Sequence, residues 1–291
     1  MQMNVVTEHK CLLAEGPLWD AKRNVICWID IWNGKIHEYD PRHQSHKVLA
    51  MQQMIGSIAI CDNGNFIAAL QNGFAFADRI SEEIKMIADP EKHLPNNRFN
   101  DGKCDPAGRF WAGTMSLSED KGAGSLYVLE KDLTFKKKIE GVTISNGLAW
   151  SADHKTLYYT DTPTLQIAAY DYDIHTGNIS NRRTIITIDE KDGYPDGMTI
   201  DNEGMLWIAH WNGGQVTRWN PDSGKKLHTI KLPVAKVTSC TFGGEKLDEL
   251  YVTTARVNLT EKELREQPLA GSLFVVHDCG YQGMPAAEFK V

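Results

Sequence analysis

Four glycines in this chain follow a residue with an oxygen-bearing side chain and open a short apolar run. The four pairs are Glu15-Gly16, Asp101-Gly102, Asn146-Gly147 and Asp196-Gly197. Each run leads through a turn into an aromatic-rich strand, a pattern typical of β-hairpins. Weaker copies of the pattern begin at Ser57 and Ser239, so the chain contains six repeated units.

The spacing of these units predicts the fold. Counted from Gly16 to Ser239, successive units begin 41, 45, 45, 50 and 42 residues apart. A period of about 40–50 residues with four short strands is typical of a β-propeller blade. The sequence therefore predicts an all-β, six-bladed β-propeller with four-stranded blades, in a single domain over residues 1–291. We expect residues 4–7 and the tail around residues 288–291 to pair in the last blade and close the ring.

Charge and composition argue against several classes of protein. The formal net charge is −7, and no basic stripe that could bind nucleic acid is present. No apolar run approaches the roughly 18 residues of a membrane-spanning helix, and residues 1–10 lack the apolar core of a signal peptide. We therefore expect a cytoplasmic protein without nucleic-acid or membrane partners, either a monomer or a weak homo-oligomer.

The cysteines and histidines form no motif along the sequence. The six cysteines include no C-x-x-C pair, which argues against zinc-finger chemistry and a disulfide framework, so we expect buried thiols. None of the ten histidines pairs with another at metal-ligand spacing, and we expect His210 to be a structural residue at a strand end. Residues 259–267 predict a short exposed helix.

The repeat predicts a site on the propeller axis. The innermost strand of each blade lines the central channel, so Glu15, Asp101, Asn146 and Asp196 should converge at one mouth. Clustered carboxylates repel one another unless a cation lies between them, and oxygen ligands suit a hard divalent ion such as Ca²⁺, Mg²⁺ or Mn²⁺. Zinc could also occupy such a site. The alternative is that these residues only cap strand starts, since Asp and Asn before Gly are common in turns.

Motifs along the whole chain resemble the SMP-30/regucalcin/gluconolactonase family, in particular its bacterial-type sugar lactonases. The resemblance is carried by residues 15–19, 97–103, 105–109, 112–115, 144–148, 195–198 and 232–234, the R-F-N-D-G-K segment above all. It implies a six-bladed propeller with one divalent metal held by Glu15, Asn146 and Asp196. It also implies that Arg98 and Asn100 contact the substrate and that Asp196 is the catalytic acid/base.

One loop departs from the family pattern. Animal members carry a substrate-contacting glutamate after the A-G-T-M segment, whereas the loop over residues 116–122 is shorter here. Ser118 or Glu119 could replace that glutamate, and the role of Asp101 stays open. The alternative to a substrate contact for Arg98 is a purely structural role, in a surface salt bridge to Asp89 or Glu91.

The expected activity is metal-dependent hydrolysis of a sugar (aldono-)lactone such as gluconolactone. The metal would polarise the ring ester, Asp196 would move a proton between water and the leaving oxygen, and Arg98 and Asn100 would orient the ring. Two alternatives are a calcium-binding regulatory propeller without catalysis and an organophosphate or aryl-ester hydrolase on the same fold. The sequence leaves the identities of the lactone and of the metal open.

Overall fold

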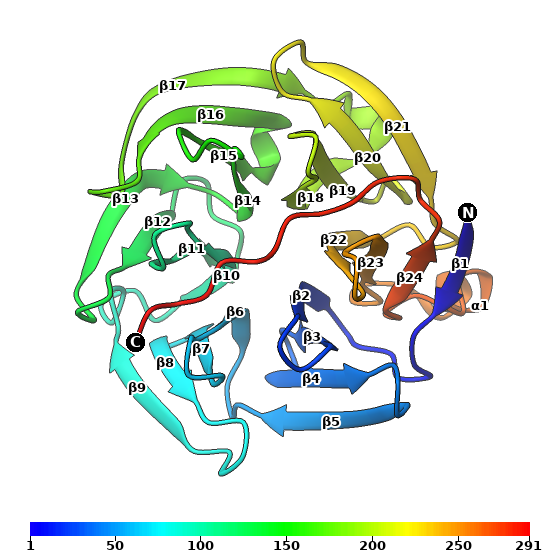
Figure 1. Cartoon of the computed structure of the whole chain (residues 1–291), viewed down its shortest axis with the longest axis horizontal. Helices are drawn as coiled ribbons and strands as arrows, with labels where there is room; N and C mark the ends of the chain where they lie inside the picture. The colour runs from blue at the N-terminus through cyan, green and yellow to red at the C-terminus, as the bar shows by residue number, and fades with distance from the viewer.

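The computed structural model describes residues 1–291 and places six four-stranded antiparallel sheets around a central axis (Figure 1). This confirms the six-bladed β-propeller. The innermost strands surround the axis and are β2 (Ala14–Asp20), β6 (Ile55–Ile60), β10 (Asn97–Cys104), β14 (Ser145–Trp150), β18 (Tyr194–Ile200) and β22 (Val237–Gly243).

The other strands form three further layers outward from the axis. The second strands are β3 (Val25–Asp30), β7 (Phe66–Leu70), β11 (Phe110–Ser116), β15 (Thr156–Asp161), β19 (Leu206–Trp211) and β23 (Glu249–Thr254). The third are β4 (Lys35–Asp40), β8 (Gly73–Ala77), β12 (Gly124–Leu129), β16 (Gln166–Asp173), β20 (Gln215–Asn220) and β24 (Phe274–His277). The outermost are β5 (Ser45–Ala50), β9 (Ile84–Ala88), β13 (Phe135–Val142), β17 (Asn178–Thr187), β21 (Lys225–Lys231) and, in the sixth blade, β1 (Gln2–Val5).

The N-terminal strand closes the ring, as expected. β1 pairs antiparallel with β24, so the sixth blade combines the first strand of the chain with the last three. Because the sixth blade contains strands from both ends of the chain, the ring is closed and only short, protected sheet edges remain.

The prediction that the C-terminal tail pairs in the last blade is wrong. Figure 1 shows the tail in red, crossing the face of the ring after β24. Gly283 forms a bridge with Asp201 in the fifth blade, and Phe289 pairs in parallel with Cys61 in the second. The fully buried Phe289 side chain packs between the second and third blades, which gives the tail an apolar anchor there instead.

The hydrophobic core consists of six clusters, one between each pair of neighbouring blades. The cluster between the sixth and first blades, for example, packs Trp19 and Trp28 against Tyr251 and Val275. Alternating strand residues therefore bury apolar side chains on both faces of each blade. The ring holds the innermost strands in fixed positions around the channel.

A polar residue fixes the hairpin after several innermost strands. Oδ1 of Asp105 accepts hydrogen bonds from the backbone N–H groups of Ala107 and Arg109, both at 2.9 Å. Asp20, Ser151 and Asp201 accept similar bonds at the same position of their own blades. These side chains satisfy backbone donors that the tight turn would otherwise leave unpaired.

Three other expectations from the sequence are borne out. All six cysteines are free and buried. His210 is buried, with Nδ1 2.9 Å from the carbonyl oxygen of Asp192 and Nε2 2.6 Å from Oγ1 of Thr217, so it is a structural residue. The expected helix forms as α1 (Glu261–Glu266). Elsewhere the chain has two short 3₁₀ turns, η1 (Thr162–Thr164) and η2 (Glu190–Asp192). None of these helices has the length and apolarity needed to cross a bilayer.

Asp105 also carries a buried network that should matter for stability. Its Oδ2 accepts hydrogen bonds from Arg109 (2.8 Å), Trp111 (2.9 Å) and Tyr172 (2.7 Å), and the carboxylate is fully buried. Asp105→Ala would leave the Trp111 and Tyr172 donors unpaired and remove the buried carboxylate that faces Arg109, so we predict a loss of about 3–5 kcal/mol in the free energy of unfolding, measured by urea denaturation. Ser151→Ala, at the same repeat position but on a more exposed turn, is the control and should cost under about 1 kcal/mol. Equal losses in the two variants would contradict this account.

Candidate metal and substrate site

The innermost strands carry β-bulges where the repeated oxygen-bearing residues lie. The pairing with the second strand shifts in all six blades, and in the four with the repeated pairs it shifts between Glu15 and Leu18, Phe99 and Gly102, Asn146 and Leu148, and Pro195 and Met198. A bulge takes residues out of the regular ladder and re-aims their side chains. These bulges therefore change the direction of side chains at the same level of the innermost strands, next to the channel.

Three of the four glycines in the repeated pairs lie where a Cβ atom would clash, whereas Gly16 has room for one and instead adopts a left-handed backbone with φ of 52°. A Cβ atom on Gly197 would lie 2.1 Å from Oγ of Ser239, and a Cβ atom on Gly147 would lie 2.8 Å from the carbonyl oxygen of Asp196. Both distances are shorter than any tolerable contact, so only glycine fits. In these blades the glycine of the motif is thus a packing requirement around the axis.

A cavity of about 310 Å³ opens at the mouth of the channel where the innermost strands begin. Its lining includes all the predicted site residues, Glu15, Arg98, Asn100, Asn146 and Asp196. Apolar and aromatic side chains surround this polar set, among them Trp32, Leu117, Tyr194 and Trp211. The structure therefore brings the predicted residues together in one pocket.

Glu15 and Asp196 are buried carboxylates that touch the same space. Glu15 is 5% exposed and Asp196 is 6% exposed. Other buried carboxylates of the chain form ion pairs with arginines, whereas these two form none. Burial raises the pKa of Glu15, and the charge of Asp101 raises it further. Burial and then the charge of Glu15 raise the pKa of Asp196 well above its usual range. The site therefore has an excess of negative charge that a bound cation would neutralise.

Asp101 does not line this cavity, contrary to the expectation that all four repeated residues meet at one mouth. It lines a second cavity of about 310 Å³ at the other end of the innermost strands, beneath residues 284–287 of the tail. Burial raises the pKa of Asp101 while the positive charge of Lys103 opposes that shift. The bulge in β10 spans both Asn100 and Asp101, so Asn100 takes the place at the mouth.

Asn146 presents an amide whose orientation is set by its neighbours. Its Nδ2 donates to Oγ1 of Thr162 at 2.8 Å, and that hydroxyl donates to the carbonyl oxygen of Pro195 at 2.8 Å. Its Oδ1 accepts from Nδ2 of Asn100 at 3.1 Å. Because the nitrogen is committed to Thr162, the oxygen with its remaining lone pair is the atom available to a cation.

Arg98 is buried without a carboxylate partner. Its guanidinium donates to the carbonyl oxygen of Phe99 (2.9 Å) and to Oδ1 of Asn100 (2.7 Å), while its buried Nε has no partner. Burial lowers the pKa of Arg98 to about 10. The alternative salt bridge to Asp89 or Glu91 is absent, since Glu91 instead accepts hydrogen bonds from Asn97 and Thr114. A buried arginine that lines a cavity without a carboxylate partner is a candidate ligand-binding group.

Glu119 is the residue of the short loop that reaches the pocket. It lines the cavity, its charge acts on Arg98, and its backbone lies in the left-handed region with φ of 57°. Ser118 instead bonds Asn96 outside the cavity lining. Of the two candidates left open by the sequence, Glu119 is therefore the one at the site. Sequence reasoning missed Thr162, Trp32 and Trp211, because they lie outside the repeated motif, at the end of β19 or just after a second strand.

The oxygen donors identified above fit a hard divalent cation. Two carboxylates and one amide oxygen come from three blades and lie in a shared, buried pocket. Ca²⁺, Mg²⁺ and Mn²⁺ prefer such ligands, and the cavity lining contains no cysteine and no histidine.

Comparison with known proteins decides the family. A family model described as SMP-30/Gluconolactonase/LRE-like region matches residues 13–256. The chain belongs to this family. A regucalcin from Oryctolagus cuniculus is 40% identical over 294 residues, covering 99% of this chain and 98% of that protein.

Two solved structures resemble this propeller over nearly their full length. A luciferin-regenerating enzyme superposes with a TM-score of 0.93 at 33% identity, covering 100% of this chain and 99% of that one. A calcium-binding protein, regucalcin, from Agrobacterium tumefaciens superposes with a TM-score of 0.94 at 28% identity, covering 99% and 97%.

The buried charge at the site predicts an unusual stability effect. The pKa of Glu15 is raised in the folded state, so above about pH 4.3 the unfolded chain loses this proton while the folded chain keeps it. The free energy of unfolding therefore falls as the pH rises. In excess chelator, Glu15→Gln should therefore unfold at higher urea concentration than wild type near pH 8, with the difference shrinking toward pH 5. The exposed Glu83→Gln variant is the control and should follow wild type. A Glu15→Gln protein less stable than wild type at pH 8 would refute the buried-charge account.

Proposed function

We propose that this protein is a metal-dependent lactonase that hydrolyses a sugar (aldono-)lactone, such as gluconolactone, to the aldonic acid. The observation that carries the proposal is the pocket itself, in which oxygen ligands lie beside a buried arginine with an unsatisfied donor. Membership of a family whose description includes gluconolactonase supports it. Initial rates on a panel of aldonolactones, corrected for spontaneous opening, test it. Absence of hydrolysis across the panel with Ca²⁺, Mg²⁺, Mn²⁺ and Zn²⁺ would reject it.

Glu15, Asn146 and Asp196 are the residues that would hold one divalent ion. They supply the oxygens of two carboxyl groups whose pKa is raised, and the amide oxygen that the hydrogen bond to Thr162 orients. When bound, such an ion polarises an ester carbonyl and favours ionisation of a nearby water. The ion also relieves the repulsion between Glu15 and Asp196, so binding should lower the pKa of both carboxyl groups.

Asp196 is the proposed acid/base. It is the second carboxylate in the pocket, and it is held at the β18 bulge by the backbone rather than by a fixed cationic partner. As a carboxylate it takes the proton of the attacking water, and as a carboxylic acid it returns the proton to the ring oxygen that leaves. Both transfers require only that Asp196 reach the two oxygens in turn.

Arg98 and Glu119 are the proposed substrate contacts, and Asn100 has a mixed role. Arg98 lines the cavity without a carboxylate partner, and Glu119 offers a carboxylate to sugar hydroxyls. Asn100 uses both amide N–H groups on Ser145 and Asn146, at 2.8 and 3.1 Å. It therefore positions Arg98 and Asn146, and only the second lone pair of its oxygen is free for substrate.

The alternatives are separated by the same experiment. A calcium-binding propeller without catalysis would need the metal ligands but gives no reason for a buried, unsatisfied Arg98. The indole rings of Trp32 and Trp211 make an aryl ester or organophosphate worth including in the panel. Faster turnover of those substrates than of any lactone would favour that class. We also propose a cytoplasmic, monomeric or weakly self-associating enzyme that needs no nucleic acid or membrane.

Asp196→Asn tests the acid/base assignment. Asparagine keeps the size of the side chain but accepts no proton at neutral pH, so turnover should fall on the order of 10²-fold or more. The exposed Asp222→Asn variant should retain wild-type kcat. Metal content is measured on the same samples. Wild-type turnover in an Asp196→Asn protein that binds metal normally would remove Asp196 from the chemistry.

Arg98→Lys separates substrate recognition from metal binding. Lysine keeps the positive charge but loses the planar set of donors, so kcat/KM should fall by about 1.5–3 kcal/mol in transition-state stabilisation. Metal affinity should change far less, because Arg98 contributes no ligand atom. A large fall in metal affinity with unchanged kinetics at saturating metal would instead assign Arg98 to support of the metal site.

A further inference from the structure

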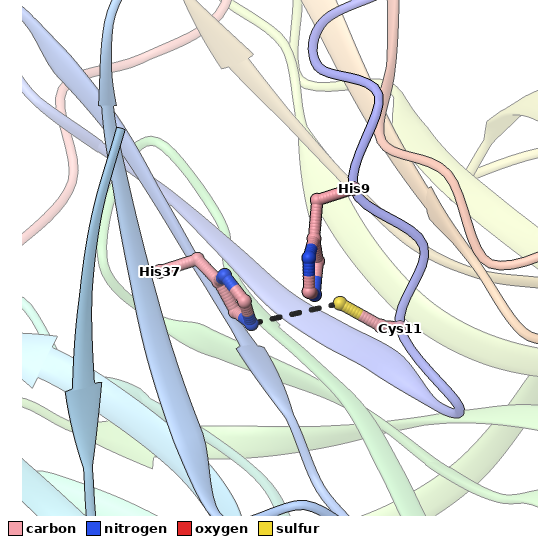
Figure 2. A group of neighbouring side chains, drawn as sticks. All are labelled: His9, Cys11 and His37. Atoms are coloured by element: carbon pink, nitrogen blue, oxygen red, sulfur yellow. Dashed lines mark hydrogen bonds between the residues drawn. The ribbon is translucent and has the colours of Figure 1, made fainter. Parts of the chain in front are cut away.

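A second cluster of metal-ligating side chains lies in the first blade, away from the channel. His9 and Cys11 come from the segment that joins β1 to β2, and His37 comes from β4. Their possible ligand atoms all lie within 4.8 Å of one another, and Figure 2 shows the three side chains pointing toward a common space. Spacing along the sequence gave no sign of this group, because the fold joins residues from different strands.

The spacing of the two buried members fits a tetrahedral zinc ion. Sγ of Cys11 and Nε2 of His37 are 3.7 Å apart. Zinc bonds of about 2.3 Å to sulfur and about 2.0–2.1 Å to nitrogen at a tetrahedral angle place those atoms about 3.6 Å apart. Both residues are almost fully buried, at 1% and 0% exposure, while His9 is half-buried and leaves a route from solvent.

The surroundings of His37 prepare its Nε2 as a ligand. Its Nδ1 lies 3.0 Å from Nε2 of His46, so one of the two nitrogens must carry the shared proton. When Nδ1 of His37 is the donor, its Nε2 lone pair is free on the side of Cys11. The ring of Trp28 stacks on His37 at 4.9 Å and 12° and fixes its plane. Such outer hydrogen bonds and packing are typical of histidines that bind metals.

We propose that His9, Cys11 and His37 form a zinc site, with water in the fourth position. A thiolate with two imidazoles suits zinc, in contrast to the all-oxygen pocket on the axis. The thiol proton of Cys11 passes to solvent as the ion binds. The segment carrying His9 and Cys11 directly follows the ring-closing strand β1, so the ion would fasten that segment to the first blade. Zinc should therefore raise the melting temperature of the intact protein.

Cobalt alone is the probe that distinguishes this site from the axial one. Co²⁺ bound to a thiolate gives a near-ultraviolet charge-transfer absorption, which an all-oxygen site cannot produce. Wild type and Cys61→Ser, which removes a different buried thiol, should both show this absorption, and added zinc should abolish it. Cys11→Ser should lack it. Absence of the absorption in wild type, or its persistence in Cys11→Ser, would overturn the proposal.

Two milder variants keep the test decisive if Cys11→Ser folds poorly. His46→Gln leaves every ligand in place but removes the partner of His37, and it should weaken cobalt affinity about 10- to 100-fold. The half-buried His9→Gln removes a ligand and should weaken it further, with a smaller zinc-induced rise in melting temperature. Cobalt affinity unchanged in both variants would equally reject the site. Lactone hydrolysis is a separate readout, so failure here leaves the proposed function untouched.

Discussion

The repulsion between buried carboxylates on the propeller axis is the constraint from which the candidate site follows. Glu15, Asp101 and Asp196 are each less than a tenth exposed, and burial raises the pKa of all three. A fold that places acids there loses stability unless something offsets the charge. Lys103 does so for Asp101, and a divalent ion is the proposed answer for Glu15 and Asp196.

The architecture explains how such a costly arrangement is held in place. Six separate apolar clusters lock the blades against one another, so the innermost strands cannot spread to relieve the repulsion. Bulges in those strands aim the side chains inward, and the C-terminal tail lies over the opposite mouth. The pocket therefore opens at one end of the channel only, and the packed blades hold its lining in place. Such a pocket suits recognition of a small polar ring.

Much of this could be predicted from the sequence because the same unit occurs six times. The period predicted the number of blades, and alignment of the glycines pointed to Glu15, Asp101, Asn146 and Asp196 at the channel mouth. The set without Asp101, and the roles of Arg98 and Asn100, came only from the family resemblance. The path of the C-terminal tail could not be predicted, since its anchor Phe289 belongs to no repeat. Asp101 was misplaced because the bulge in β10 spans Asn100 and Asp101 and Asn100 takes the place at the mouth, which the position of the glycine does not reveal.

The His9, Cys11 and His37 cluster was missed for a related reason. His37 is 26 residues beyond Cys11, and only the return of β4 beside the segment before β2 brings them together. Local spacing rules find metal sites on one hairpin or helix, and they do not find sites assembled across a blade. Residues outside the repeat are thus where the structure adds most to the sequence.

Anomalous diffraction from crystals soaked in Mn²⁺ tests the central claim most directly. The account predicts one strong peak at the channel mouth, within bonding distance of carboxylate oxygens of Glu15 and Asp196 and of Oδ1 of Asn146, and no such peak in crystals of Glu15→Gln. A fully occupied manganese ion elsewhere in the channel, or a channel mouth without manganese at saturating concentration, would contradict it.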